Sequence, residues 1–218
     1  MRWYKTFSLA VLSVLLFASP WAIAEEEVME GVHYLRITPA QPTNAPKGKV
    51  EITELFWYGC PHCFRFEPQL NAWLKKKPDG IVFNRVPSPL NPKWEIHSRV
   101  FYAAEALGLT DKIHEPFFNA IHIDRKPLFT EDAILDFIAS VGVDRKKFAA
   151  AMKSFSVSSK VRYALKLGRS ANATGVPALI VNGKYLLDGK TAGSHASMIR
   201  LAEQLARQEL KDKASESR

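Results

Sequence analysis

Only two cysteines occur among the 218 residues, and both lie in one tetrapeptide, Cys60-Pro61-His62-Cys63. Two cysteines cannot build the disulfide framework of a small secreted domain, nor a zinc or iron–sulfur site made of cysteines alone within one chain. The fold must therefore rest on a hydrophobic core, and a chain with 47% hydrophobic residues is long enough to form one. Any thiol or disulfide chemistry of this chain must therefore take place at this tetrapeptide.

The tetrapeptide is predicted to begin a helix. Residues 49–57 before it are typical of a strand, and apolar residues recur at helical spacing after it. Pro61 suits the first turn, because its missing N–H would have no partner there. Pro68, inside the helix, predicts a kink. The predicted apolar face consists of Cys63, Phe66, Leu70, Trp73 and Leu74.

The start of a helix stabilises a negative charge on Cys60. Backbone N–H groups of the first turn and the positive end of the helix dipole favour the thiolate over the thiol, and His62 adds a nearby donor or positive charge. Each unit by which the thiol pKa falls below ambient pH makes the disulfide about 30 mV more oxidising. A Cys60–Cys63 disulfide is therefore predicted to pass readily to the thiols of another protein.

Three other interpretations of the cysteine pair compete with this one. A structural disulfide across so short a loop would contribute roughly 2 kcal/mol, against about 3 kcal/mol for a loop of about 15 residues. Half of a zinc site would need two further ligands, and His114 and His122 are eight residues apart rather than three to five. Two inert thiols would be unusual in an oxidising compartment. The redox interpretation is favoured over all three.

The N-terminal residues have the pattern of a secretory signal. Arg2 and Lys5 precede an apolar stretch over residues 7–17, which is shorter than the roughly 20 residues of a membrane span. We predict export, with cleavage after Ala24. The net charge of +8 remains positive without these residues, but the longest basic run is residues 75–77, so we expect no nucleic-acid partner.

Strands and helices are predicted in an order that suggests one fold. Strand patterns cover residues 32–38, 50–57 and 80–86, and a hairpin covers residues 178–181 and 184–187 around Asn182-Gly183. Helical patterns cover residues 93–173 and 195–211. Within the first of these, helix starts are predicted at Thr110, Thr130 and Asp144 and helix ends at Gly108 and Gly142. Without the first helical stretch, this order is the thioredoxin arrangement.

Three segments resemble the DsbA family of periplasmic thiol:disulfide oxidants. They are Phe-Trp-Tyr-Gly-Cys-Pro-His-Cys at 56–63, Thr-Gly-Val-Pro at 174–177 and Asn-Gly-Lys-Tyr at 182–185. The resemblance covers roughly residues 32–211. It implies an α/β thioredoxin fold with an inserted all-helical domain.

The domain organisation expected from this resemblance has five parts. They are a cleaved signal peptide at 1–24, a first thioredoxin-like part at 25–88, the helical insertion at 89–160, a second thioredoxin-like part at 161–213 and a frayed tail at 214–218.

The resemblance also assigns a substrate site. It implies that Pro177 follows a cis peptide bond and lies against the cysteine pair, and that the backbone of Val176 pairs with an extended substrate segment. Backbone pairing tolerates varied side chains, as substrates that share only a cysteine require. Helical spacing turns Phe66 inward and Phe64 outward, so Phe64 is the candidate for an apolar rim that contacts unfolded proteins.

Glu54 interrupts the apolar face that residues 50, 52 and 56 form on the predicted strand. The resemblance places an acid here beneath the disulfide, where it would relay protons to and from Cys63. The competing interpretation is a carboxylate at a strand edge, in water or paired with Lys or Arg. The lysine that some members place near this acid has no clear counterpart, since the third strand offers only Arg85.

Together these features predict a monomeric, periplasmic dithiol oxidase whose Cys60 forms a mixed disulfide with reduced, unfolded exported proteins. The resemblance implies reoxidation by a quinone-linked membrane protein of the DsbB type. We expect neither an organic cofactor nor a metal. The alternatives are a reductase or isomerase of the same fold, and a non-catalytic chaperone or metal-binding module.

Overall fold

The computed structural model describes residues 27–216. The predicted signal peptide, the cleavage site after Ala24 and residues 217 and 218 of the predicted tail lie outside this range.

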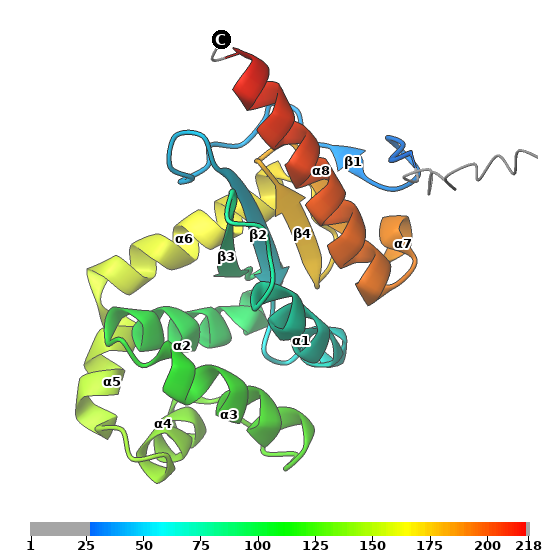
Figure 1. Cartoon of the computed structure of the whole chain (residues 1–218). Coiled ribbons are helices and arrows are strands. Elements are labelled where there is room, and N and C mark those ends of the chain that lie inside the picture. The colour runs from blue at the N-terminus through cyan, green and yellow to red at the C-terminus, as the bar shows by residue number, and fades with distance from the viewer. Residues whose placement is uncertain (1–26, 217–218) are drawn as a thin grey trace, which may run out of the picture.

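A five-stranded sheet of order β1-β5-β4-β2-β3 forms the centre of the molecule (Figure 1). Only β2 and β3 pair in parallel, and the other neighbours are antiparallel. The strands are β1 (Leu35–Arg36), β2 (Val50–Phe56), β3 (Ile81–Pro87), β4 (Ala178–Val181) and β5 (Tyr185–Asp188). The helices are α1 (Pro61–Leu74), α2 (Glu95–Ala106), α3 (Thr110–His122), α4 (Glu131–Ser140), α5 (Arg145–Lys153), α6 (Phe155–Ser170), α7 (Gly189–Ala192) and α8 (His195–Glu216), with a 3-10 turn η1 (Pro92–Trp94).

The two faces of the sheet bury separate apolar clusters. Val50 and Ile52 of β2 pack with Phe66 of α1 and Met198 of α8. On the other side, Leu55 belongs to a larger cluster that extends through helices α2 to α6. Figure 1 shows α8 lying across the sheet and the helices α2 to α5 gathered beyond its lower end. This is the expected thioredoxin fold with an inserted all-helical segment.

The central elements agree with their sequence patterns. Strand β2 is buried along its whole length and ends one residue before the predicted limit, and β3 runs beside it. The side chains of Thr130 and Asp144 cap α4 and α5, whereas Thr110 is the first helical residue of α3 rather than its cap. The glycines after α2 and α4 take the positive φ that ends a helix, +67° at Gly108 and +73° at Gly142. Helix α1 continues through Pro68 to Leu74, and the kink there stays a prediction.

The first strand was predicted too long. Strand β1 covers two residues instead of 32–38, because residues 31–33 form a turn in which the His33 N–H donates to the Met29 carbonyl at 2.9 Å. Gly31, just before the predicted strand, has a φ of +78°, a left-handed conformation that suits a turn. This edge strand is therefore shorter than its alternating pattern indicates.

The C-terminal elements follow the predicted hairpin and helix with two differences. Asn182 and Gly183 both take positive φ, as the expected turn requires, but the second strand is β5 (Tyr185–Asp188) rather than 184–187. Helix α8 extends to Glu216 and so includes residues that were predicted to fray, and near its end the Lys213 ammonium donates to the Lys49 carbonyl at 2.8 Å. Helix α6 continues through residue 160, and the domain division placed there stays a prediction.

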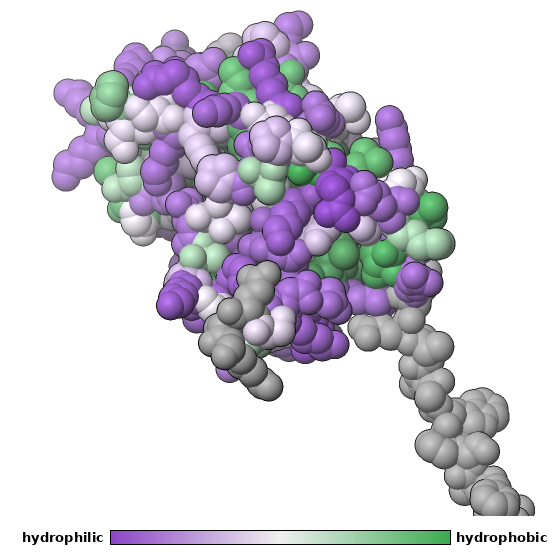
Figure 2. All heavy atoms as spheres, turned by 90° about the horizontal axis from the view of Figure 1, so that it is seen from above, coloured by the Kyte–Doolittle hydropathy of each residue, from purple (hydrophilic) through white to green (hydrophobic). Residues whose placement is uncertain are grey.

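The face seen from above in Figure 1 carries mostly hydrophilic side chains, with smaller hydrophobic areas between them (Figure 2). Between residues 27 and 216, no helix combines the length and the hydropathy of a membrane span. The reactive pair lies where β2 passes into α1, and that junction is described next.

Candidate active site

Cys60 and Cys63 occupy different environments at the start of α1. Cys60 is the N-cap residue of the helix, and its sulfur accepts a hydrogen bond from the Cys63 backbone N–H at 3.5 Å. Cys63 lies one turn further along and is fully buried. Both residues are free thiols in the structure. One sulfur thus faces the helix end, and the other faces the core.

The environment of Cys60 lowers its pKa to about 6. A hydrogen bond from the Cys63 thiol is the largest cause, and the backbone N–H groups of Cys63 and His62 and the charge of His62 add to it, while burial opposes them. The pKa of Cys63 is instead raised well above the ordinary value, first by burial and then by Cys60. Near neutral pH, the reduced pair therefore carries one thiolate, on Cys60, and one thiol, on Cys63.

The structure brings the predicted substrate-site residues to the same place. The peptide bond between Val176 and Pro177 is cis, as the resemblance implies. As a thiol, Cys60 donates to the Val176 carbonyl at 3.4 Å. A loop 116 residues away in sequence thus contacts the reactive sulfur.

Of the other predicted residues, Pro61 and His62 are both exposed, and Pro61 is the first residue of α1. The His62 Nδ1 atom lies 3.1 Å from an Arg65 guanidinium nitrogen. Phe64 is half-buried rather than fully outward, because its ring stacks on that of His122. Its role as an apolar rim stays a prediction.

Glu54 is fully buried on β2, next to Arg85 of β3. The Arg85 Nε atom lies 3.3 Å from a Glu54 carboxylate oxygen, an ion pair in which neither group has hydrogen-bond geometry. The same guanidinium donates to Glu67 of α1 at 3.1 Å. Glu54 is therefore not a strand-edge carboxylate in water, because β2 lies inside the sheet, but it does lie beside an arginine, and Arg85 stands between two acids.

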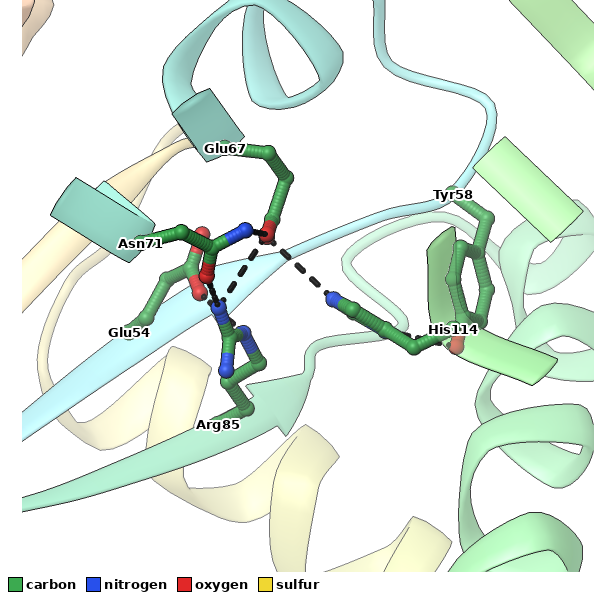
Figure 3. A network of polar contacts seen from close by, with 6 residues as sticks. All are labelled: Glu54, Tyr58, Glu67, Asn71, Arg85 and His114. Atoms are coloured by element: carbon green, nitrogen blue, oxygen red, sulfur yellow. Dashed lines mark hydrogen bonds and ion pairs between the residues drawn. The ribbon is translucent and has the colours of Figure 1, made fainter. Parts of the chain in front are cut away.

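Glu67 is the centre of a polar network that continues into the helical insertion (Figure 3). Asn71 donates to it at 3.1 Å, and the His114 Nε2 atom of α3 lies 3.3 Å from its other oxygen. The His114 Nδ1 atom in turn lies 2.8 Å from the Tyr58 hydroxyl. A side chain of the insertion thus joins α1 to the residue two positions before Cys60.

The two carboxylates differ in protonation. Burial and the charge of Glu67 raise the pKa of Glu54 to about 8, against the weaker opposing effect of Arg85. Burial also opposes ionisation of Glu67, but hydrogen bonds and charge from His114 and Arg85 outweigh it and lower the pKa. Environments that separate two neighbouring acids in this way assign them different roles. Near pH 7 the proton resides on Glu54.

Sequence reasoning did not identify Glu67, Asn71, Tyr58 or His114 as parts of the site. One signal for Glu67 was available, because it lies four residues after Cys63 and therefore on the same face of α1. His114 was considered only as a metal ligand. Within residues 27–216, no group of three or more His, Cys, Asp or Glu side chains is arranged to hold a metal ion.

Comparison with known proteins places these features in a family context. Residues 80–205 match the family model of the DSBA-like thioredoxin domain. The thiol:disulfide interchange protein DsbA of Azotobacter vinelandii is 39% identical over 188 residues, which are 86% of this chain and 87% of that protein. The DsbA of Burkholderia cepacia is 44% identical over 178 residues, 82% of each protein. The crystal structure of Pseudomonas aeruginosa DsbA is similar with a TM-score of 0.78 at 37% identity, and the match covers 86% of this chain and 96% of that one.

The two cysteines should react at different pH values. We expect alkylation of the reduced protein by iodoacetamide to follow a midpoint of about pH 6 at Cys60, while Cys63 stays unmodified through neutral pH. Mass spectrometry of the digested protein after timed alkylation separates the two sites. A Cys60 midpoint near that of an ordinary thiol, about 8.5, would contradict the electrostatic analysis of this helix end.

The contribution of Glu54 to the stability of the reduced protein should fall as pH rises from about 4.5 to about 8. Over this range folded Glu54 keeps a proton that the unfolded chain has lost, so raising the pH favours unfolding by up to about 1.4 kcal/mol per pH unit. Glu54→Gln removes this contribution. We expect its stability advantage over wild type, measured by urea unfolding, to grow across that range and to level off beyond it.

Glu67→Gln provides the matched variant for this measurement. Removing the Glu67 charge lowers the pKa of Glu54, so the pH-dependent loss of stability should end at a lower pH than in wild type. A stability difference between Glu54→Gln and wild type that does not change with pH would show that Glu54 is not the buried acid inferred here.

Proposed function

Since this chain belongs to the DsbA family of thiol:disulfide interchange proteins, we propose that it is an exported dithiol oxidase that donates a Cys60–Cys63 disulfide to folding proteins. The observation that carries this direction of transfer is the lowered pKa of Cys60 beside the raised pKa of Cys63. A reduced pair with a stabilised thiolate lies low in free energy, so its disulfide is a strong oxidant.

The exchange proceeds in two displacements. A substrate thiolate attacks the Cys60 sulfur, the Cys60–Cys63 bond breaks, and its electron pair goes to the Cys63 sulfur, which takes up a proton. A second substrate thiolate then attacks the substrate sulfur of the mixed disulfide, and Cys60 leaves as the thiolate. The substrate gains a disulfide, and the enzyme keeps two electrons and the proton on Cys63.

Glu54 is the proposed source of that proton. Cys63 is buried and its pKa is raised well above the ordinary value, so its sulfur needs a proton as it leaves. Glu54 is also buried and carries a proton near pH 7. Once Glu54 has given up its proton, its negative charge is one of the contributions that raise the pKa of Cys63, which supports electrostatic coupling of the two groups.

The substrate is proposed to bind across Val176 and Pro177. In the Cys60–Cys63 disulfide the Cys60 sulfur carries no hydrogen to donate to the Val176 carbonyl, so that carbonyl is open to an N–H of an extended substrate segment. Phe64, which is half-buried beside α3, is the proposed apolar contact for reduced, unfolded substrates. Pro61 and His62 complete the tuning of the Cys60 thiolate at the start of α1.

The cellular setting follows from the signal pattern and from the family. We propose that the chain is exported to the periplasm after cleavage at Ala24 and acts there as a monomer. Reoxidation by a quinone-linked membrane protein of the DsbB type would close the cycle. The disulfide itself is the redox group, so the proposal includes no organic cofactor, metal or nucleic acid.

Single cysteine variants test the order of attack. Cys63→Ser should accumulate a mixed disulfide when its Cys60 thiolate attacks a one-cysteine peptide that is joined to glutathione by a disulfide: glutathione leaves as the thiol, and the Cys63 thiol that would displace the peptide is missing. Cys60→Ser should transfer no disulfide to a reduced two-cysteine peptide. Both reactions are followed by non-reducing electrophoresis with mass spectrometry. Wild-type protein, oxidised beforehand, should convert one equivalent of peptide to its disulfide.

Two outcomes would contradict this proposal. Full peptide oxidation by Cys60→Ser would exclude Cys60 as the attacked sulfur. Failure of the oxidised wild-type protein to oxidise the peptide, together with ready reduction of a peptide disulfide by the reduced form, would identify a reductase instead.

A further inference from the structure

Two histidines of α3 contact Tyr58, one at its side-chain hydroxyl and the other at its backbone carbonyl. The His114 Nδ1 atom lies 2.8 Å from the Tyr58 hydroxyl, and the His122 Nε2 atom lies 2.8 Å from the Tyr58 backbone carbonyl. Tyr58 is fully buried and stands two positions before Cys60. A helix of the insertion therefore fixes the chain just ahead of the reactive sulfur.

The Tyr58 carbonyl belongs to the turn that carries Cys60 into α1. The Cys60 backbone N–H donates to the Trp57 carbonyl at 3.0 Å, which closes a four-residue turn with Tyr58 and Gly59 in the middle. A carbonyl can only accept, so the His122 Nε2 atom is the donor. This hydrogen bond sets the orientation of the peptide plane between Tyr58 and Gly59.

Gly59 has no side chain whose contacts could fix the orientation of that peptide plane. The Trp57 indole ring lies so close over Gly59 that a side chain at this position would collide with it, which explains the glycine. A residue without a Cβ rotates easily about its backbone bonds. The orientation of the turn thus depends on its hydrogen bonds, and the bond from His122 is the one that reaches the Tyr58–Gly59 peptide plane from another helix.

His122 also contacts the chain on the other side of the cysteine pair. Its ring stacks on Phe64, with ring centres 4.8 Å apart and an angle of 17° between the planes. The Phe64 backbone N–H donates to the Cys60 carbonyl at 3.1 Å. One side chain of the insertion therefore touches both the turn before Cys60 and the first turn of the helix after it.

We propose that His122 is a positioning residue for disulfide exchange, whose N–H fixes the Tyr58–Gly59 peptide plane and thereby aims the Cys60 sulfur at the backbone N–H groups of α1. The proposal rests on the proposed function of the cysteine pair. The Cys63 backbone nitrogen lies 3.5 Å from the Cys60 sulfur, an ordinary distance for a sulfur acceptor, and a rotation of the turn would move the sulfur away from this donor. His114 supports the same residue from its hydroxyl end.

Two substitutions separate the donor of His122 from its ring. His122→Phe keeps an aromatic ring against Phe64 but leaves the buried Tyr58 carbonyl without a donor. His122→Gln loses the ring and places an amide N–H at a comparable distance from the backbone. If the donor positions Cys60, the Phe variant is impaired and the Gln variant is restored.

The readouts are the alkylation of Cys60 across pH and the rate of oxidation of a reduced two-cysteine peptide. We expect His122→Phe to slow both reactions near pH 7 about tenfold, about 1.4 kcal/mol, and to move the Cys60 alkylation midpoint to higher pH. His122→Gln should remain within about twofold of wild type, since it keeps the donor. Urea unfolding of each variant shows whether the protein is folded under these conditions.

Wild-type rates and an unshifted midpoint in His122→Phe would overturn the proposal, and so would impairment of His122→Gln as severe as that of His122→Phe, because restoring an N–H donor would then not restore the exchange. Should His122→Phe not fold, His122→Met removes the donor with a flexible apolar side chain and is judged by the same criteria. Alkylation of Cys60 needs no substrate protein, so wild-type protein that fails to oxidise the peptide would count against the proposed function and leave this test valid.

Discussion

The whole site depends on the end of one helix, where a negative charge is stabilised on one sulfur and opposed on the next. Cys60 caps α1 and meets backbone N–H groups, whereas Cys63, one turn along, is enclosed by the core. The β2 strand, buried along its length, delivers the chain to this point, and the loop ending in Pro177 closes over it. Both sulfurs belong to one short helical segment, but their environments are unequal. The stabilised thiolate on Cys60 favours the reduced pair and so drives the transfer of the disulfide to a substrate.

The buried acids around Arg85 show that this arrangement lowers the stability of the folded chain. A buried carboxyl without a hydrogen bond destabilises the folded chain once it ionises, and Glu54 is such a group. Perturbed titratable groups of this kind concentrate at functional sites. The network also gives the helical insertion a part in the chemistry, since His114 holds Glu67, and Glu67 keeps the proton on Glu54.

Much of this could be predicted from sequence, because the signals were local. The alternation of β2, the proline after Cys60 and the Asn182-Gly183 turn each specify a structure within a few residues. The role of Glu54 as a buried acid was visible as a break in an apolar face. The contacts of His114 and His122 were not, since they join α3 to residues 47 to 64 positions earlier, and such pairings depend on how the insertion packs. The turn at Gly31 shortened β1 despite its pattern for a related reason, since the edge of a sheet constrains its strand weakly.

The central claim, that the reduced pair is stabilised by a thiolate on Cys60, is tested most directly by the redox potential of the pair in glutathione buffers between pH 5 and 8. Each proton taken up with the two electrons changes the potential by about 30 mV per pH unit. The account predicts a potential clearly more oxidising than that of thioredoxin, about −270 mV. It also predicts a slope of about 60 mV per pH unit below pH 6 and about 30 mV above it, since only Cys63 keeps its proton there. A potential near that of thioredoxin, with a slope of about 60 mV per pH unit through pH 8, would contradict it.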